Sequence, residues 1–383
     1  MLLFIFGAQI EIDVTFRIPL HLSYLSCIIE CSYIHVSMKT YSEDIMTLTM
    51  KEIARLADVS QPTVSRVINN NPNVNPEIAA KVRSVIEQYG FVPNKSAQTL
   101  KRSDSHLIGI SVVNISNPYF MELIEALEKE CREHGYSIIL QNSQHDALLE
   151  QENMANFVAR QADGILLVPT DECDLAKFRS IPVPIIIITL IKDLFDSVAI
   201  SHQKGGALVA EHFIKQGHYR FAFIGPQNDE KFQGFQEGLY ANGYNFDRDN
   251  MIELAGNHNS QYQVRQCIAN YLDSHPVLNF TSVFCYNDLT AVEFIKQLEE
   301  RGLSSSQFAI AGFDDTILAK TLAMTSVHQP ITDMAKQAFQ LLVQKINQNE
   351  PHTEPSRILL LDPQLVVRAS TLNKPSEISL GVN

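Results

Sequence analysis

Residues 50–69 read Met-Lys-Glu-Ile-Ala-Arg-Leu-Ala-Asp-Val-Ser-Gln-Pro-Thr-Val-Ser-Arg-Val-Ile-Asn, and this stretch decides the fold of the first part of the chain. Thr49 and Glu52 have the spacing of a capping box, in which each side chain bonds the backbone amide of the other residue. Apolar residues then recur at helical spacing, which predicts one helix over 50–57 and another over 61–68. The expected core stripes are Ile53, Ala54 and Ala57 in the first helix and Val64, Val67 and Ile68 in the second.

A third helix completes a small bundle. Asn75 and Pro76 supply its N-cap and first residue, and Gly90 ends it. Its expected core stripe is Ile78, Val82, Val85, Ile86 and Tyr89. Three such helices match the helix-turn-helix plan, in which the second helix enters the major groove of DNA. Another small helical bundle with a polar second helix would show the same pattern.

Charge separates this bundle from the rest of the chain. The protein has 383 residues and a net charge of −13, yet residues 50–103 carry eight basic side chains against four acidic ones. A basic module on a large acidic body is typical of a polyanion-binding head joined to a sensor or an enzyme. The length predicts two or three domains, and no apolar run is long enough to span a membrane. Six scattered cysteines favour a reducing compartment, here the cytoplasm.

The run Val-Ser-x-x-Thr-Val-Ser-Arg-Val-Ile-Asn over 59–69 closely resembles the signature of the lactose-repressor (LacI/GalR) family of transcription regulators. The similarity continues through Tyr-Gly-Phe-Val-Pro-Asn at 89–94 and covers residues 48–371. It implies a regulator, in most members a repressor, that binds a near-palindromic double-stranded operator as a homodimer or tetramer. The DNA contacts that it implies in the head are Thr49, Gln61, Pro62, Thr63, Ser65, Arg66, Asn69, Asn73 and Asn75. Pro62 departs from the family, because many relatives carry a base-reading side chain there.

The resemblance also implies a hinge helix in the linker, at 94–104, that folds on the operator. In the family, two hinge helices enter the minor groove and a leucine wedges into a base step, which bends the DNA. By motif position that leucine is Leu100, with Ser96 and Ala97 lining the groove and Asn94 near the DNA backbone. The expected organisation is an extension without its own fold (1–47), the helix-turn-helix domain (48–93), the hinge (94–104), an effector-binding and dimerisation domain (105–371) and a tail (372–383).

After residue 105, strand-like apolar runs alternate with amphipathic helical ones in two consecutive sets. This alternation predicts parallel sheets covered on both faces. The expected fold is therefore an all-α helix-turn-helix head and an α/β, periplasmic-binding-protein-like body of two doubly wound lobes. Ligands of such folds bind at the carboxyl ends of the strands, which here means the cleft between the lobes.

Residues that would meet an effector follow the strands. The resemblance assigns effector-binding positions to Tyr119, Phe120, Lys231, His258 and Asp288, with core packing as the alternative for Phe120. Asp171 is a candidate because it follows the strand that ends at Val168, and a plain turn residue is the alternative there. Lys231 replaces an arginine of the family motif, so a single ammonium replaces a bidentate fork. Ser201-His202 replaces the usual Asp-Asn pair. Such sites usually hold a sugar or sugar derivative, and a nucleoside, a purine or a phosphorylated sugar remains an alternative.

Other function classes fit less well. No G-x-S-x-G elbow, P-loop or H-E-x-x-H motif occurs, so we expect no enzyme, no metal and no cofactor. A solute-binding protein would need a signal peptide and no basic head, and the chain has the reverse. The third alternative is a DNA-binding protein with a degenerate, non-sensing body.

Overall fold

The computed structural model describes residues 2–5, 8–11, 48–68, 71–91, 104–170, 173–254, 261–348, 356–372 and 374. The chain divides into two compact units, Met1–Asn94 and Lys95–Asn383. The first unit begins with β1 (Leu2–Ile5) and β2 (Ala8–Glu11), which pair antiparallel. The sequence predicts no regular element there, so this hairpin is a difference from the expectation.

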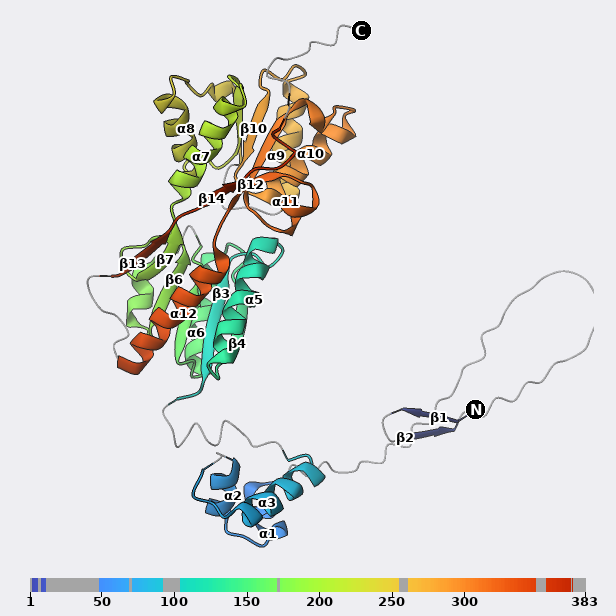
Figure 1. Ribbon diagram of the computed structural model, residues 1–383, viewed down its shortest axis with the longest axis vertical. Coiled ribbons are helices and arrows are strands. Elements are labelled where there is room, and N and C mark those ends of the chain that lie inside the picture. The colour runs from blue at the N-terminus through green and yellow to red at the C-terminus, as the bar shows by residue number, and fades with distance from the viewer. Residues whose placement is uncertain are drawn as a thin grey trace, which may run out of the picture. The chain divides into compact units, whose positions relative to one another are not determined.

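The other described residues of the first unit contain three helices, α1 (Met50–Leu56), α2 (Gln61–Ile68) and α3 (Pro76–Gln88) (Figure 1). The capping box of α1 is confirmed, because the Glu52 amide donates to Thr49 Oγ1 at 3.3 Å and the Thr49 amide donates to Glu52 Oε2 at 2.7 Å. Asn75 caps α3, as predicted, by accepting a 2.8 Å hydrogen bond from the Glu77 amide.

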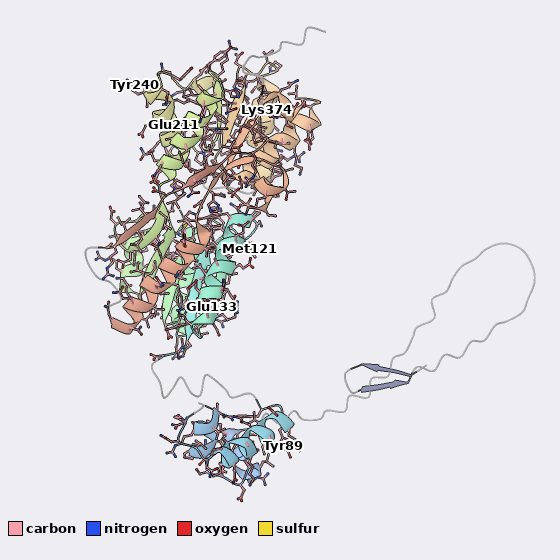
Figure 2. The ribbon with its side chains drawn as sticks, viewed as in Figure 1. Tyr89, Met121, Glu133, Glu211, Tyr240 and Lys374 are labelled. Carbon is pink, nitrogen blue, oxygen red and sulfur yellow. The ribbon has the colours of Figure 1, made fainter. Side chains whose placement is uncertain are left out.

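The core of the head lies where α1 and α2 meet α3. Its buried members are Ile53, Ala54, Ala57, Val64, Val67, Ala79 and Val82. The stripe predicted for α3 is wrong at Ile78 and Tyr89, which are 38% and 48% exposed (Figure 2). The buried face of α3 instead includes Ala79. This residue is small enough to let α3 approach the other two helices.

The first lobe of the second unit is a parallel sheet in the order β13-β7-β6-β5-β3-β4. Its strands are β3 (Leu107–Val112), β4 (Ser137–Asn142), β5 (Gly164–Leu167), β6 (Ile185–Thr189), β7 (Asp196–Ile200) and β13 (Ile358–Leu361). Its helices are α5 (Pro118–Glu133), α6 (Ala147–Ala159), the short 3-10 helix η1 (Leu175–Ser180) and α12 (Ile331–Gln348).

Two close contacts show that helices cover both faces of this sheet. A Cβ at Gly109 would meet Phe157 of α6, and a Cβ at Gly164 would meet Leu342 of α12. Gly164 pairs with Ile108, the neighbour of Gly109, so these two glycines face opposite sides. The prediction of a doubly wound lobe is therefore confirmed.

The second lobe is a sheet in the order β14-β12-β11-β10-β8-β9, in which β14 alone runs antiparallel to its neighbour. Its strands are β8 (Phe221–Gly225), β9 (Met251–Glu253), β10 (Ser282–Cys285), β11 (Ala309–Asp314), β12 (Thr325–His328) and β14 (Gln364–Val366). Its helices are α7 (His202–Lys215), α8 (Glu230–Ala241), α9 (Gln261–Ser274), α10 (Asp288–Glu300) and α11 (Ile317–Thr321), with short 3-10 turns η2 (Arg248–Asn250) and η3 (Ser305–Gln307).

Within the described residues, the chain crosses from one lobe to the other at three places. These crossings lie between β7 and α7, between β12 and α12, and between β13 and β14. Figure 1 shows the second passage plainly, because the late helix α12 lies against the strands of the first lobe. Residues 329–330 join β12 to α12 and form this crossover. Strands β9, β12, β13 and β14, which the sequence does not predict, have only three or four residues each.

Two glycines allow the first turns of α7 and α8 to pack in direct backbone contact. A Cβ at Gly206 would overlap the carbonyl oxygen of Lys231, and a Cβ at Gly234 would overlap that of Gln203. The two helix backbones therefore touch, which fixes the first turn of α8 in place. No helix in the described part of the chain is both long and apolar enough to cross a membrane.

Candidate functional site

The second helix of the head presents a polar face opposite its core stripe. Gln61, Pro62 and Arg66 are exposed on it, and Thr63 and Ser65 are half-buried. The Thr63 hydroxyl lies 2.8 Å from the Ser60 hydroxyl and fastens the start of the helix. An exposed polar N-terminal half is what a recognition helix needs to reach base edges.

Two residues expected at the DNA also have local structural roles. The Thr49 hydroxyl takes part in the capping box, and Asn75 Oδ1 is occupied by the cap of α3. Asn73 is exposed in the loop before α3. The other assigned DNA contacts, Asn69, Asn94, Ser96, Ala97 and Leu100, lie outside the described residues, as do Asp171 and His258 of the effector set.

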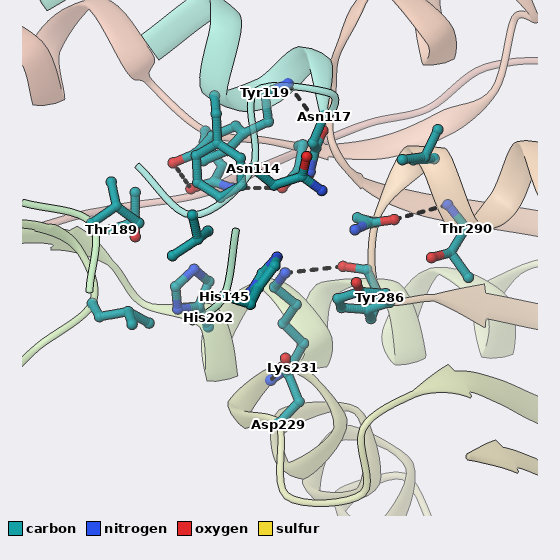
Figure 3. Close-up of a pocket in the computed structure, with 18 of the residues that line it drawn as sticks. Asn114, Asn117, Tyr119, His145, Thr189, His202, Asp229, Lys231, Tyr286 and Thr290 are labelled. Carbon is teal, nitrogen blue, oxygen red and sulfur yellow. Dashed lines mark hydrogen bonds between the residues drawn. The ribbon is translucent and has the colours of Figure 1, made fainter. Parts of the chain in front are cut away.

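A cavity of about 350 Å³ lies between the lobes of the second unit. Its walls come from the carboxyl ends of strands in both lobes. Asn114 and Tyr286 follow β3 and β10, and Thr189 is the last residue of β6 (Figure 3). Asp314 is the last residue of β11. This is where the fold predicts a ligand.

Lys231 enters the cavity from the first turn of α8. Its Nζ donates a 2.9 Å hydrogen bond to the Tyr286 carbonyl and lies 4.3 Å from the centroid of the Phe313 ring (Figure 3). An aromatic face attracts a cation, so the ammonium is held from the protein side. An ammonium has three donors, and Tyr286 occupies one of them.

Asp314 is a buried acid in the wall of the cavity. It has a left-handed backbone, with φ 103°, and its Oδ1 accepts a 2.7 Å hydrogen bond from Gln329 Nε2. Gln329 Oε1 in turn accepts a 3.0 Å hydrogen bond from the Tyr119 hydroxyl. Burial raises the pKa of Asp314 to about 7, although nearby Lys231 acts in the opposite direction. The carboxyl therefore titrates near neutral pH, and a ligand donor would favour its charged form.

The sequence predicts that Asp288 contacts the effector, but Asp288 does not line the cavity. Its side chain is buried outside the cavity wall. It accepts hydrogen bonds from the Thr316 amide at 2.7 Å, the Thr316 hydroxyl at 2.9 Å and the Ser326 hydroxyl at 2.6 Å. Asp288 thus anchors the loop after β11, and the preceding residue, Asn287, lines the cavity while capping α10.

Two aromatic residues predicted for the site do line it. The rings of Tyr119 and Phe120 at the start of α5 lie 5.2 Å apart in a T-shaped pair. His202, at the start of α7, faces them across the cavity, with Glu230 3.6 Å from its Nδ1. Burial lowers the pKa of His202 despite the opposing effect of Glu230, so the ring offers a neutral donor and acceptor.

Sequence reasoning missed several lining residues, namely Asn287, Asp314, Gln329, His202 and Tyr286. The signal that could have found them is position, since each lies at or directly after the carboxyl end of a strand. The charged residues of the wall are Asp229, Glu230, Glu293 and Asp314 against Lys192 and Lys231. The described residues contain no cluster of three or more histidine, cysteine or acidic side chains suited to a metal ion.

Comparison with known proteins agrees with this architecture. Residues 49–94 match the model of bacterial regulatory proteins of the lacI family, and residues 210–371 match a periplasmic binding protein-like domain. The ribose operon repressor of Escherichia coli (strain K12) is 30% identical over 339 residues, which are 84% of this chain and 99% of that protein. Catabolite control protein A of Priestia megaterium is 29% identical over 339 residues, 85% and 100% of the two chains.

Solved structures share the fold. The lac repressor dimer bound to operator and the anti-inducer ONPF superposes with a TM-score of 0.72 at 22% identity and covers 85% of this chain and 99% of its own. The transcriptional regulator CelR in complex with cellobiose gives a TM-score of 0.61 at 24% identity, over 84% and 99% of the two chains. With a helix-turn-helix head, a two-lobed body and a relative at 30% identity over nearly its whole length, the chain belongs to the lacI family of bacterial regulatory proteins.

Proposed function

We propose that this protein is a sequence-specific DNA-binding repressor whose operator affinity is controlled by a small effector bound between the lobes. One observation carries the proposal: the chain that bears the exposed polar face of α2 also contains a polar interlobe cavity at the carboxyl ends of its strands. The named relatives support it, since they are the ribose operon repressor, PurR and catabolite control protein A.

The composition of the cavity supports a neutral, hydroxyl-rich effector. Four acidic side chains against two lysines would repel a phosphate or carboxylate, and one of the lysines already donates to a backbone carbonyl. Asp314 and the amides of Asn114 and Asn287 can pair with hydroxyl groups. A volume of about 350 Å³ is near the lower end for ligand pockets and suits a single sugar ring. Relatives with solved structures hold ribose or cellobiose.

The division of labour along the chain follows from the same proposal. Residues 48–93 bind the operator, 105–371 bind the effector and dimerise, and 94–104 form the hinge between them, with Leu100 as the minor-groove wedge. Leu100→Ala should then reduce operator affinity and DNA bending and leave effector binding unchanged. We further propose that the protein acts in the cytoplasm, and that the cavity binds its ligand without catalysis, as expected of a regulator.

The DNA-binding half is tested by selection of the full chain against random duplex DNA. A two-fold symmetric consensus, bound about 1,000-fold more tightly than random DNA at physiological salt, is the expected result. Binding without any consensus would contradict a sequence-specific repressor.

The sensing half is tested by isothermal titration with D-ribose, D-glucose, adenosine and D-ribose 5-phosphate. A neutral sugar should bind, and its phosphate ester should bind at least about tenfold more weakly because of the acidic wall. Tighter binding of the ester would overturn the proposed ligand class. Absence of binding by every compound, together with a clear DNA consensus, would favour the alternative of a non-sensing body.

A further inference from the structure

The loop that follows β11 joins the effector cavity to a segment that connects the lobes. Asp314 and Asp315 are consecutive residues with left-handed backbones, at φ 103° and 53°. This conformation is unfavourable for residues with a Cβ, so surrounding contacts must hold it. Asp314 lines the cavity, and Asp315 lies just beyond it, at a second cavity on the other side of Gln329.

The two aspartates contact two consecutive residues of the crossover that leads to α12. Strands β11 and β12 are parallel, with Asp314 opposite His328 in the register. Asp314 Oδ1 accepts from Gln329 Nε2 at 2.7 Å, and Asp315 Oδ2 lies 3.2 Å from His328 Nδ1. The start of this crossover is therefore held both by Asp314, which lines the cavity, and by the next residue, Asp315.

Asp315 also contacts the segment that follows β14. Its Oδ1 accepts a 2.6 Å hydrogen bond from Nη2 of Arg368, which lies beyond β14, at the end of this strand away from the passage from β13. Arg368 Nη1 donates to the Met324 carbonyl at 2.8 Å, directly before β12. The Asp315 side chain is only 6% exposed, so one buried carboxylate joins the start of the crossover to α12 to the segment that follows β14.

The remaining residues of the loop fix its opposite end. The amide and the hydroxyl of Thr316 both donate hydrogen bonds to the Asp288 carboxylate. The Ile317 amide donates a 3.2 Å hydrogen bond to Glu122 Oε1 on α5, which belongs to the first lobe. The loop is thus held at one end by the second lobe and touches the first lobe at the other.

We propose that Asp315 is a positioning residue for the effector site: through His328 and Arg368 it holds the crossover so that Gln329 presents its amide to Asp314. Effector contact with Asp314 then reaches the crossover to α12 through Gln329. The part of this inference that concerns effector transmission rests on the proposed function, whereas the positioning of the crossover can be tested without any ligand.

Hydrogen–deuterium exchange of the full chain provides the ligand-free test. In Asp315→Asn, backbone amides over 325–334 should exchange at least about fivefold faster, while those of α9 (Gln261–Ser274), which lies away from the loop, stay within about twofold of wild type. His328→Ala removes the same contact from a half-exposed residue and should have a smaller effect of the same kind. The matched control is Asp362→Asn, which removes only the exposed pair of Asp362 with Lys204 in the passage from β13 to β14.

A ligand arm separates positioning from general destabilisation. With D-ribose as the probe, titration of Asp315→Asn should show at least about fivefold weaker binding than wild type, and Asp362→Asn should match wild type. Unchanged exchange over 325–334 in both Asp315→Asn and His328→Ala, or an equal rise in α9, would overturn the inference. If wild type does not bind ribose, the proposed ligand is wrong, and the exchange data alone still decide the role of Asp315.

Discussion

At the scale of single residues, the buried carboxyl of Asp314 lowers the stability of the folded protein and supplies a hydrogen-bond acceptor to the effector site. Burial raises the pKa of its carboxyl from 3.8 to about 7, so between these values the folded protein retains a proton that the unfolded chain releases. The free energy of unfolding therefore falls as the pH rises through this window, and the full cost is present above it. We predict that Asp314→Asn raises the free energy of unfolding by about 1–3 kcal/mol at pH 8 and much less at pH 4.

Urea unfolding at the two pH values measures this difference. Asp333→Asn, a change at an exposed acid at the start of α12, is the control and should show no such dependence. The same Asp314→Asn variant should lose effector binding, because it cannot offer a charged acceptor. A variant that is less stable than wild type at pH 8 would show that the buried carboxylate is fully compensated in the native protein.

Lys231 gives a second prediction at this scale. Its ammonium lies between the Tyr286 carbonyl, the Phe313 ring and the cavity. Lys231→Met keeps an unbranched side chain only one atom shorter but removes the donor, and it should weaken effector binding by about 1–3 kcal/mol, measured by isothermal titration. Lys204→Met is the control, since Lys204 is exposed and pairs with Asp362 outside the cavity. Equal losses in both variants would argue for a general charge effect.

At the scale of elements, the prediction concerns the exposed face of α2. Arg66 is exposed on this helix, and Lys51 is exposed on α1. Arg66→Ala should reduce operator affinity by about 1–3 kcal/mol and relax base preference, as expected of a base-edge contact. Lys51→Ala should weaken specific and random DNA about equally, because a phosphate contact carries no base information. Identical binding profiles over a library of operator variants would refute this assignment of the recognition face.

Elements with strong local signals could be predicted from the sequence, and those fixed by distant contacts could not. The capping box at Thr49 and the cap at Asn75 depend on residues a few positions apart, so the starts of α1 and α3 were found. Strands β13 and β14 are short, and their places in the sheets depend on pairing with β7 and β12, far away in sequence. Ile78 and Tyr89 were misplaced because Ala79, not a large residue, faces the other helices.

The candidate site shows the same limit. The family resemblance assigns Asp288 to the site, and the sequence cannot tell that the neighbouring residue, Asn287, faces the cavity instead. The choice depends on Thr316 and Ser326, which bind the Asp288 carboxylate and turn it away. Asp314 was overlooked for a similar reason, since its left-handed backbone and its contact with Gln329 are tertiary features.

At the scale of the whole molecule, an exposed apolar groove on the second unit is the candidate dimer surface. Met121 and Ile317 line it, at 48% and 57% exposed. Met121, labelled in Figure 2, lies on α5 of the first lobe, and Ile317 lies on α11 of the second. Exposed apolar groups gathered across two lobes are typical of an interface. We predict that Met121→Asp yields monomers in sedimentation and reduces operator affinity, because one head covers only half of a two-fold site. Tyr240→Asp, at a more exposed side chain on α8, should remain dimeric.

The claim that the cavity controls the head requires that an effector bind two arrangements of the lobes with different affinities. The most direct measurement is the operator dissociation constant of the full-length protein, at fixed salt, with and without a saturating amount of the best-binding neutral sugar. We predict a change of at least about tenfold in wild type and none in Asp314→Asn, with sugar-free operator affinity the same in both. A sugar that saturates the wild-type cavity and leaves the operator dissociation constant unchanged would contradict this account.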